Sequence, residues 1–552
     1  MHAQPLPLFY YLEHFTAVLR LLRERDHDLL TPTESDFIHE FFRLPRQAQA
    51  LIARMAARSK AVFCESSLRY PELSDLHRLL ALLQAAGWIN TDPVVTMPQL
   101  FAALPVSRLA SGFGLKLNRT LNKGRMLRQA QEMYPGTSAL SGTNFRIDEP
   151  LYQFVHAQLC RRLCAQYFGN HHQDWSQYLI ADRGIRRYEC VKFDAASRPF
   201  RIRQEIDSFH GIHLCAEMLD TDSSAASAQV LLPQSPTTCD WLKQRHQSVA
   251  YRLAQRLERE RELSSALALY RSIGSSEAVG RLRIVSRKLT GGRRGPGVSR
   301  HAVPHIDLSL SHGGEQKIEQ RVASELERME PACEVQVVEN RLFNAMFGLL
   351  FWRVLFAPVR GAFFHAFQTS PADLYGAQFC DQRRSLLDES LDALHTGDYV
   401  RSMRETFKAK AGISNPWVAW WWLRPSMLER ALECIPAQHL LAIFQWMLGD
   451  LRRNTTGFPD LIQYWPSEPR YRLLEVKLGA DRLQGNQRQF LQYASHHDLP
   501  VSVCYVTAPS LPPAARMRKS RAPPAVNVSL NLFPVEAASV RVLHLLGNKD
   551  FR

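Results

Sequence analysis

The sequence predicts a multidomain, mainly α-helical protein that contains a small mixed α/β unit near its C-terminal end. The chain has 552 residues, which is too many for one hydrophobic core, because domains usually hold about 100–200 residues. Over most of the chain, apolar residues recur every three or four positions, as in amphipathic helices. Short β-prone runs separated by turn residues occur only near the C-terminal end.

Residues 1–145 are expected to form a helical region. The runs SDFIHEFFRLPRQAQALIARMAARS and LSDLHRLLALLQAAGWI have helical periodicity. Residues 101–130 contain several basic side chains and no acidic one. A run of one sign beside Gly and Asn loops is suited to phosphate contact, although a basic solvent-exposed face is an equal alternative. The candidate DNA-binding residues of this segment are Lys116, Arg119, Lys123 and Arg125.

Residues 146–310 are expected to form a second helical region followed by a linker. The run WLKQRHQSVAYRLAQRLERERELSSALALYRSIGSSEAVGRLRIVSRKL predicts three short helices with small residues at the turns. Its SSALALY segment resembles the second helix of a tetratricopeptide unit, so we describe the region as helical repeat-like (TPR-like). The basic run GGRRGPG is rich in Gly, which indicates a linker or an exposed loop.

Residues 311–552 contain the most informative segment of the chain. The run PDLIQYW, the turn PSEPR and the run YRLLEVKL predict a β-hairpin, and DRLQGNQRQFLQYASHH predicts an amphipathic helix. Side chains two positions apart share one face of a strand, so Glu475 and Lys477 are expected on one face and Val476 on the other. Pairing of the hairpin is expected to bring Asp460 close to Glu475.

Two carboxylates and a lysine in this arrangement predict a metal-dependent hydrolytic site. Hard divalent cations prefer oxygen ligands, which Asp460, Glu475 and the carbonyl group of Val476 can supply. Lys477 can orient an attacking water molecule and stabilise charge on a phosphoryl group, as metal-assisted phosphodiester hydrolysis requires. The alternative is structural: Asp460 as a turn residue, and Glu475 and Lys477 as an exposed pair on an edge strand.

The bulk composition favours a nucleic-acid partner. The formal net charge of +15 indicates a polyanionic partner, with nucleic acid first and a membrane surface second. We find no signal peptide and no run of about 18 apolar residues. The nearest such run, Phe347–Pro358, is interrupted by Arg353 and predicts a buried helix. The ten cysteines are expected to be reduced thiols in the cytoplasm.

The residues around the hairpin resemble those of a known family. Pro459-Asp460 followed by Glu475-Val476-Lys477 is similar to the PD-(D/E)xK pattern of restriction-like nucleases. The longer text GFPDLIQYW, RLLEVKL and DRLQ resembles the VRR-NUC domain, and within it the Fanconi-associated nuclease family. The basic segment at 101–130, with leucines, GLK and a basic second helix, resembles a SAP-type DNA-binding pattern.

A second block, VVENRLFNAMFGLLFWRVLF, resembles the family's helix that opens the nuclease domain and carries a further acidic metal ligand. Glu339 falls on that acidic position. We expect Glu339 to share a helical stripe with Phe343, Met346, Phe347 and Leu350, where a buried carboxylate needs a partner such as a metal ion. The alternative is an exposed Glu in the first turn of the helix, favoured by the helix dipole.

The resemblance implies a fold and an activity. It implies that residues 311–552 form an α/β restriction-endonuclease-like domain with a mixed sheet. It further implies a structure-selective DNA nuclease, with 5′-flap endonuclease and 5′→3′ exonuclease activity, that acts in DNA repair and on interstrand crosslinks. The expected cofactor is one or two Mg²⁺ or Mn²⁺ ions, and the expected partner is branched or flapped duplex DNA. We expect a monomer in the cytoplasm (at the nucleoid if bacterial), with no membrane contact and no small-molecule cofactor.

The resemblance also suggests further site residues and leaves two alternatives open. Arg452 matches a family arginine near the scissile region, Arg453 and Arg482 are phosphate contacts or solvated side chains, and Gln487 supports the catalytic residues. No Cys/His set matches the ubiquitin-binding zinc finger of animal members, and Asn486 replaces a basic residue. One alternative is a Holliday-junction-resolvase-like nuclease, which does not need the long helical half. The other is an inactive scaffold that binds branched DNA.

Overall fold

The computed structural model describes most of the chain up to Thr507. The described residues are 7–58, 60–91, 93–112, 122–134, 149–193, 197–221, 224–233, 239–290, 303–310, 316–479 and 481–507. Among these residues, no helix is both long and apolar enough to cross a membrane. All ten cysteines lie in the described ranges and are free thiols, as the sequence predicted.

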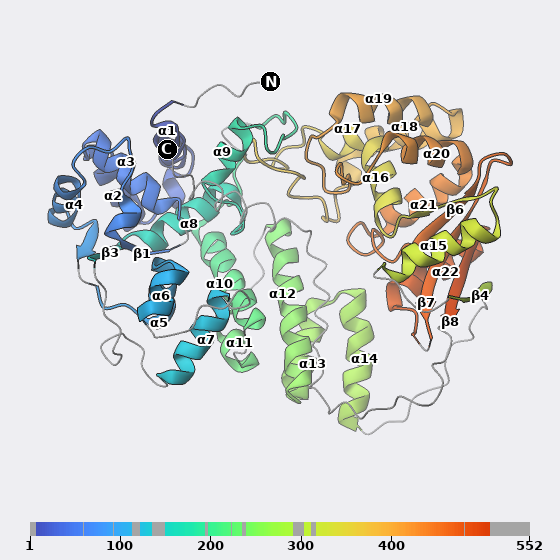
Figure 1. Ribbon diagram of the computed structural model, residues 1–552, viewed down its shortest axis with the longest axis horizontal. Coiled ribbons are helices and arrows are strands. Elements are labelled where there is room, and N and C mark those ends of the chain that lie inside the picture. The colour runs from blue at the N-terminus through green and yellow to red at the C-terminus, as the bar shows by residue number, and fades with distance from the viewer. Residues whose placement is uncertain are drawn as a thin grey trace. The chain divides into compact units, whose positions relative to one another are not determined.

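The N-terminal part consists mainly of helices, as predicted, which pack around two hydrophobic cores, together with a small sheet that the sequence did not predict (Figure 1). The sheet has the antiparallel order β1-β3-β2. Strands of three or four residues are too short to show an alternating pattern in the sequence. The elements are α1 (Tyr10–Arg25), η1 (His27–Leu29), α2 (Pro32–Arg43), α3 (Arg46–Ala56), β1 (Val62–Cys64), η2 (Glu65–Leu68), α4 (Leu76–Ala85), β2 (Ile89–Thr91), α5 (Met97–Ala103), α6 (Val106–Gly112), α7 (Lys123–Met133), β3 (Leu151–Phe154), α8 (Ala157–Phe168) and α9 (Ser176–Asp182).

The middle part is helical and contains the three helices predicted for residues 241–289. They are α12 (Asp240–Arg259), α13 (Leu263–Ile273) and α14 (Ser276–Thr290), which follow α10 (Arg203–Asp220) and α11 (Ala225–Leu231). Consecutive helices pack on one another through small and apolar side chains such as Ala250, Ala254, Ala266 and Tyr270. Small residues allow this close approach of neighbouring helices, as in helical repeats.

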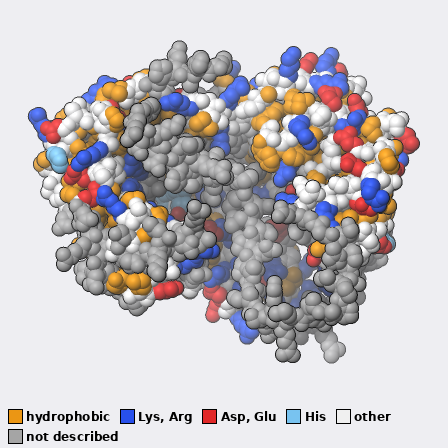
Figure 2. Space-filling view, in the orientation of Figure 1, with side chains coloured by type: hydrophobic (Ala, Val, Ile, Leu, Met, Phe, Trp, Pro, Cys, Tyr) orange, Lys and Arg blue, Asp and Glu red, His pale blue; other side chains and the backbone are white. Residues whose placement is uncertain are grey.

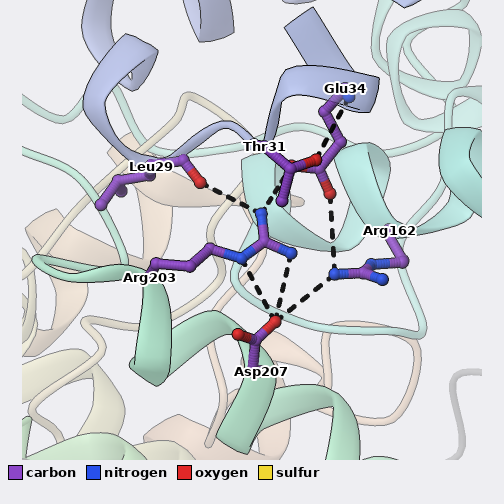
Figure 3. Close-up of polar contacts among 6 residues, drawn as sticks. All are labelled: Leu29, Thr31, Glu34, Arg162, Arg203 and Asp207. Carbon is purple, nitrogen blue, oxygen red and sulfur yellow. Dashed lines mark hydrogen bonds and ion pairs between the residues drawn. The ribbon is translucent and has the colours of Figure 1, made fainter.

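A buried carboxylate joins α2 to α8 and α10 (Figure 3). The helix α2 begins with a capping box in which Thr31 and Glu34 each bond the other's backbone N–H group. The Glu34 side chain is buried and accepts a hydrogen bond of 2.5 Å from Arg203, which also donates to Asp207. Arg162 lies 3.6 Å from the Glu34 carboxylate. The carboxylate therefore caps one helix and pairs with charges from two others.

Replacing Arg203 by Met is expected to destabilise the protein by about 3 kcal/mol, because Glu34 loses its main charged partner while it stays buried. Arg162 remains nearby, which keeps the loss at the low end of the range for breaking a buried pair. Thermal unfolding followed by circular dichroism measures the effect. Arg201→Met, which removes an exposed guanidinium two residues away, is the control; equal unfolding temperatures for both variants would contradict this role of the pair.

The C-terminal part contains a five-stranded mixed sheet of order β4-β8-β7-β6-β5, which confirms the predicted α/β domain. The pairs β5-β6 and β6-β7 are antiparallel, whereas β7-β8 and β4-β8 are parallel. Its elements are β4 (His305–Ser309), α15 (Ile318–Met329), β5 (Glu334–Val337), α16 (Arg341–Leu350), α17 (Trp352–Leu355), η4 (Asp381–Arg383), α18 (Arg384–Thr396), α19 (Tyr399–Lys410), α20 (Pro425–Cys434), α21 (Ala437–Gly449), β6 (Leu461–Trp465), β7 (Arg470–Leu478), α22 (Gly485–His496) and β8 (Val501–Thr507).

Both faces of this sheet are covered by helices (Figure 1). On one face, α15 packs against Leu461, Leu474 and Val476. On the other face, a larger core unites the sheet with α16, α18, α21 and α22. The apolar run from Phe347 forms the buried end of α16 and then α17, as expected. Alternate residues of β7 therefore enter different cores, which decides where each polar side chain of that strand points.

The domain division at 145/146 and 310/311 stays a prediction. The third strand of the small sheet, β3, and the helix α8 belong to the N-terminal core although they follow residue 145. Likewise β4, which precedes residue 311, is an edge strand of the C-terminal sheet and pairs with β8.

Candidate nuclease active site

The β6-β7 hairpin places Asp460 opposite Glu475, as the sequence predicted. Leu461, the first residue of β6, pairs with Leu474 of β7, so Asp460 lies one step further along, beside Glu475. The Asp460 carboxylate accepts a hydrogen bond of 2.9 Å from the backbone N–H group of Val476. Its backbone carbonyl accepts bonds from the N–H groups of Val338 and Glu339. Asp460 is thus attached to two segments that are distant in the sequence.

Glu475 and Lys477 share one face of β7, and Val476 lies on the opposite face in the core with α15. The Lys477 ammonium group is 2.6 Å from Glu475 Oε1. Gln487, in the first turn of α22, donates to the same oxygen at 2.5 Å. The Gln487 side chain also accepts a hydrogen bond from the Gln484 backbone in the capping box that begins the helix. The cap therefore orients Gln487 toward the carboxylate.

The electrostatics of this pair suit a cation. Burial and the nearby Asp460 carboxylate raise the pKa of Glu475 from 4.5 to about 7, against the opposing effect of Lys477. Burial likewise raises the pKa of Asp460. The second oxygen of Glu475, Oε2, is buried without a hydrogen-bond partner. Two neighbouring carboxyl groups that resist ionisation, one half-buried and one buried with an unsatisfied oxygen, gain stabilisation from a divalent ion.

Glu339 does not occupy the helical stripe expected for it. The helix α16 begins at Arg341, and Glu339 precedes it in a left-handed backbone conformation with φ of 42°. Its side chain is exposed and lies 3.8 Å from Arg341. Phe343, Met346 and Phe347 are buried as expected. The backbone bonds of residues 338 and 339 to Asp460 make the helix begin only at Arg341, because they hold this segment in a turn beside β6.

The side chains expected to bind a metal ion are not all brought together among the described residues. No three His, Cys, Asp or Glu side chains of the described ranges lie together in a way that could hold a metal ion. Asp460, Glu475 and the carbonyl group of Val476 are the groups that could contribute oxygen ligands at the hairpin. The Glu339 carboxylate is attached to the same turn through its backbone, but its side chain pairs with Arg341.

Two residues that support the site were missed from the sequence. Asn340 accepts a hydrogen bond of 3.1 Å from the Phe458 backbone, which ties the turn before α16 to the turn before Asp460. Gly457 has φ of +89°, and a Cβ atom there would lie 2.8 Å from the backbone of Asn486 at the start of α22. The only signal for Gly457 was its place in a Gly-Phe-Pro turn, which does not reveal the close approach of α22.

Known proteins share this architecture and this segment. A family model described as VRR-NUC domain matches residues 395–508, and a model described as FAN1, HTH domain matches residues 9–90. The Fanconi-associated nuclease 1 homolog of Pseudomonas aeruginosa is 37% identical over 92% of this chain and 99% of its own length. The chain belongs to the Fanconi-associated nuclease family. It is therefore a DNA nuclease, and nucleases of the VRR-NUC type depend on divalent metal ions.

Solved structures agree with this assignment. The chain matches a crystal structure of paFAN1 bound to DNA with a two-nucleotide 5′ flap and a gap, with a TM-score of 0.80 and 36% identity over 92% of this chain and 100% of that one. The Schizosaccharomyces pombe homolog is 29% identical, but over only 31% of this chain and 24% of its own length. The HTH region was not recognised from the sequence, which showed only amphipathic helices there.

The basic residues expected in this nuclease lie in different surroundings. Arg452 is exposed, packs over the Tyr375 ring and reaches Gln244 at 3.5 Å. Arg453 lies 3.2 Å from Glu277 of α14. Arg482 is exposed in the loop before α22. In the N-terminal segment, Lys123 and Arg125 begin α7, whereas Lys116 and Arg119 lie outside the described residues. Figure 2 shows Lys and Arg side chains interspersed with Asp and Glu on the face drawn.

Proposed function

We propose that this nuclease is structure-selective, cuts 5′-flap DNA endonucleolytically and degrades DNA 5′→3′, and acts in the repair of interstrand crosslinks. The observation that carries the proposal is the carboxyl pair of half-buried Asp460 and buried Glu475, held beside Lys477 with one oxygen of Glu475 unsatisfied. Support for the substrate comes from relatives of the same length, one of which is solved with 5′-flap DNA.

The proposed metal ligands are Asp460, Glu475, Glu339 and the carbonyl group of Val476, with Mg²⁺ or Mn²⁺ as the ion. When bound, such an ion activates water and polarises the scissile phosphate. To bind the ion, the Glu339 carboxylate would have to leave Arg341 and point toward the hairpin. A change of side-chain rotamer can do this because the Glu339 side chain is exposed. Gln487 holds the Glu475 carboxylate in place through its hydrogen bond.

Lys477 is proposed to orient the attacking water and to stabilise negative charge that develops on the phosphate. Its side chain is largely buried, and its ammonium group is held by Glu475. A fixed ammonium group in a partly desolvated site stabilises developing charge more strongly than a solvated one. The same group favours the ionised form of Glu475, because it lowers the pKa of that carboxyl.

Lys477→Met is expected to reduce the cleavage rate about 100- to 1,000-fold at pH 8.5, the range for loss of one transition-state donor. Because the variant lacks the ammonium group that lowers the pKa of Glu475, its remaining activity should also shift to higher pH. Single-turnover rates from pH 6 to 9 measure both effects. Arg401→Met, an exposed residue of the same domain to which no DNA contact is assigned, is the control; an unchanged rate for Lys477→Met would remove this residue from the mechanism.

The proposed DNA contacts are Lys116, Arg119, Lys123 and Arg125 in the SAP-like segment, and Arg452, Arg453 and Arg482 in the nuclease domain. Replacing the first four together by Gln should weaken DNA binding. If each contacts one phosphate, the slope of log affinity against log salt should fall by about 3–4. Fluorescence anisotropy at several salt concentrations measures this slope; the same slope as in the wild type would mean that the segment does not contact DNA.

The experiment that tests the proposal compares cleavage of end-labelled 5′-flap, 3′-flap, four-way-junction and single-stranded DNA, with Mn²⁺, Mg²⁺ or EDTA. Metal-dependent cutting near the 5′-flap junction is expected. Preferred cutting of the four-way junction would instead favour a Holliday-junction-resolvase-like nuclease. Tight binding of branched DNA without any cutting would favour an inactive scaffold. The presence of all three residues Asp460, Glu475 and Lys477 argues against that alternative.

A further inference from the structure

The aromatic run NPWVAWWWLRP contains one tryptophan that does not pack into the core. Trp417 is buried, and Trp420 and Trp422 are half-buried against the core of the nuclease domain. Trp421, between the last two, is 76% exposed. It is the largest exposed apolar side chain of the described residues, and exposure of a whole indole needs an explanation.

Hydrogen bonds on both sides of Trp421 fix the backbone that carries its exposed side chain. The N–H groups of Trp422 and Leu423 both donate to the carbonyl oxygen of Ala419 at 2.9 Å, so residues 419–423 form a closed turn. The Trp420 indole donates to the carbonyl of Ile413 at 2.6 Å. Because both neighbours of Trp421 are anchored, the backbone that carries its ring has little conformational freedom to lose on binding.

Trp421 lies beside the candidate active site. The Arg341 guanidinium lies over the Trp421 ring, 5.3 Å from its centroid, and its Nη2 atom is 3.8 Å from a carboxylate oxygen of Glu339. Residues 338 and 339 bond directly to the Asp460 backbone. The Arg341 guanidinium, which contacts Glu339 at the candidate site, thus covers one face of the indole. The high exposure of Trp421 indicates that the other face is open.

We propose that Trp421 is a stacking platform for the unpaired nucleotide next to the scissile phosphate, and that Arg341 supports the ring from its other side. An aromatic face recognises any base, since every base has a π face. A cation beside the ring also adds attraction for the adjacent phosphate. This inference rests on the proposed function and deepens it: the platform selects DNA with an unpaired base at the cleavage position, without reading sequence.

The test pairs a protein change with a substrate change. Wild type, Trp421→Ala and Trp421→Phe are compared on 5′-flap DNA that carries either a base or an abasic residue at the first unpaired position. We expect Trp421→Ala to lose about 5- to 100-fold in kcat/KM on the flap with the base, which corresponds to the stacking of one base. On the abasic flap, wild type and Trp421→Ala should be equal. Trp421→Phe should keep most of the activity.

A binding arm separates this inference from the substrate proposal. In the non-cleaving Asp460→Asn background, Trp421→Ala should weaken binding of a single-stranded oligonucleotide but not of its abasic counterpart, whichever branched DNA is preferred. Met329→Ala, which removes another exposed apolar side chain of the same domain, should behave as the parent. Equal losses on base-containing and abasic DNA, or no loss on either, would overturn the platform. If the wild-type protein shows no preference for 5′-flap DNA, the proposed substrate is overturned. The binding measurement then decides by itself whether Trp421 is a stacking platform.

Discussion

Asp460→Asn is expected to reduce metal-dependent DNA cleavage at least about 1,000-fold, because loss of the charge that we propose as a metal ligand removes several kcal/mol of transition-state stabilisation. The fold should survive, since an Asn side-chain oxygen can still accept the hydrogen bond from the Val476 backbone. Steady-state cleavage of labelled DNA measures the loss. Asp481→Asn, an exposed acid of the same domain, is the control and should keep full activity.

The same change should stabilise the metal-free protein at high pH. The pKa of Glu475 is raised to about 7, in part by the charge of Asp460. A carboxyl whose pKa is higher in the folded than in the unfolded state costs no stability below about pH 4.5, where it is protonated in both states. The cost develops between about pH 4.5 and pH 7 and is complete above that range. Neutralising Asp460 should therefore raise the free energy of unfolding by about 1–2 kcal/mol at pH 8, and by nothing near pH 4.

Addition and removal of metal ions test the same carboxyl pair, Asp460 and Glu475. In the wild type, Mn²⁺ should raise the unfolding temperature more at pH 8 than at pH 6, because ion binding requires ionised Glu475 and releases protons. EDTA should reverse the gain. In Asp460→Asn, the gain should be largely absent at both pH values. A stabilisation by Mn²⁺ that is equal in the variant and the wild type would place the metal site elsewhere.

Gly457→Ala is expected to destabilise the protein by about 2–4 kcal/mol and to reduce cleavage more than tenfold. The left-handed conformation of Gly457 is unfavourable for Ala, and the new Cβ would approach the Asn486 backbone to 2.8 Å. To relieve this overlap, the start of α22 has to shift. Gln487, in the first turn of that helix, bonds Glu475, so the shift moves the carboxylate support as well.

Gly479→Ala is the matched control for the backbone conformation. Gly479 also has a positive φ, of 56°, but an added Cβ there meets nothing within 4 Å. It should lose about 1 kcal/mol from the left-handed conformation alone and keep its cleavage rate. Thermal unfolding and single-turnover cleavage compare the two variants. Similar losses of activity for both would show that contact with α22 is not what matters at position 457.

Local patterns in the sequence were sufficient for the hairpin and the middle helices. The alternation in YRLLEVKL predicted that Glu475 and Lys477 share a face, and the 2.6 Å contact confirms it. Pairing of the predicted hairpin was expected to bring Asp460 close to Glu475, and the strand register places them side by side. The three helices of residues 240–290 followed from their periodicity. In each case the determining interactions lie within about 20 residues of one another.

The tertiary structure decided what depends on distant segments. The start of α16 at Arg341, rather than before Glu339, follows from backbone bonds to Asp460, about 120 residues away. The exposure of Trp421 and the burial of Trp417 depend on the core assembled around α16. The constraint on Gly457 comes from α22, and the partners of Glu34 come from α8 and α10. The sequence by itself determined the candidate catalytic groups Asp460, Glu475 and Lys477, because they lie on one hairpin; only long-range packing determined their supports and the position of Glu339, because periodicity carries no information about which distant element a surface meets.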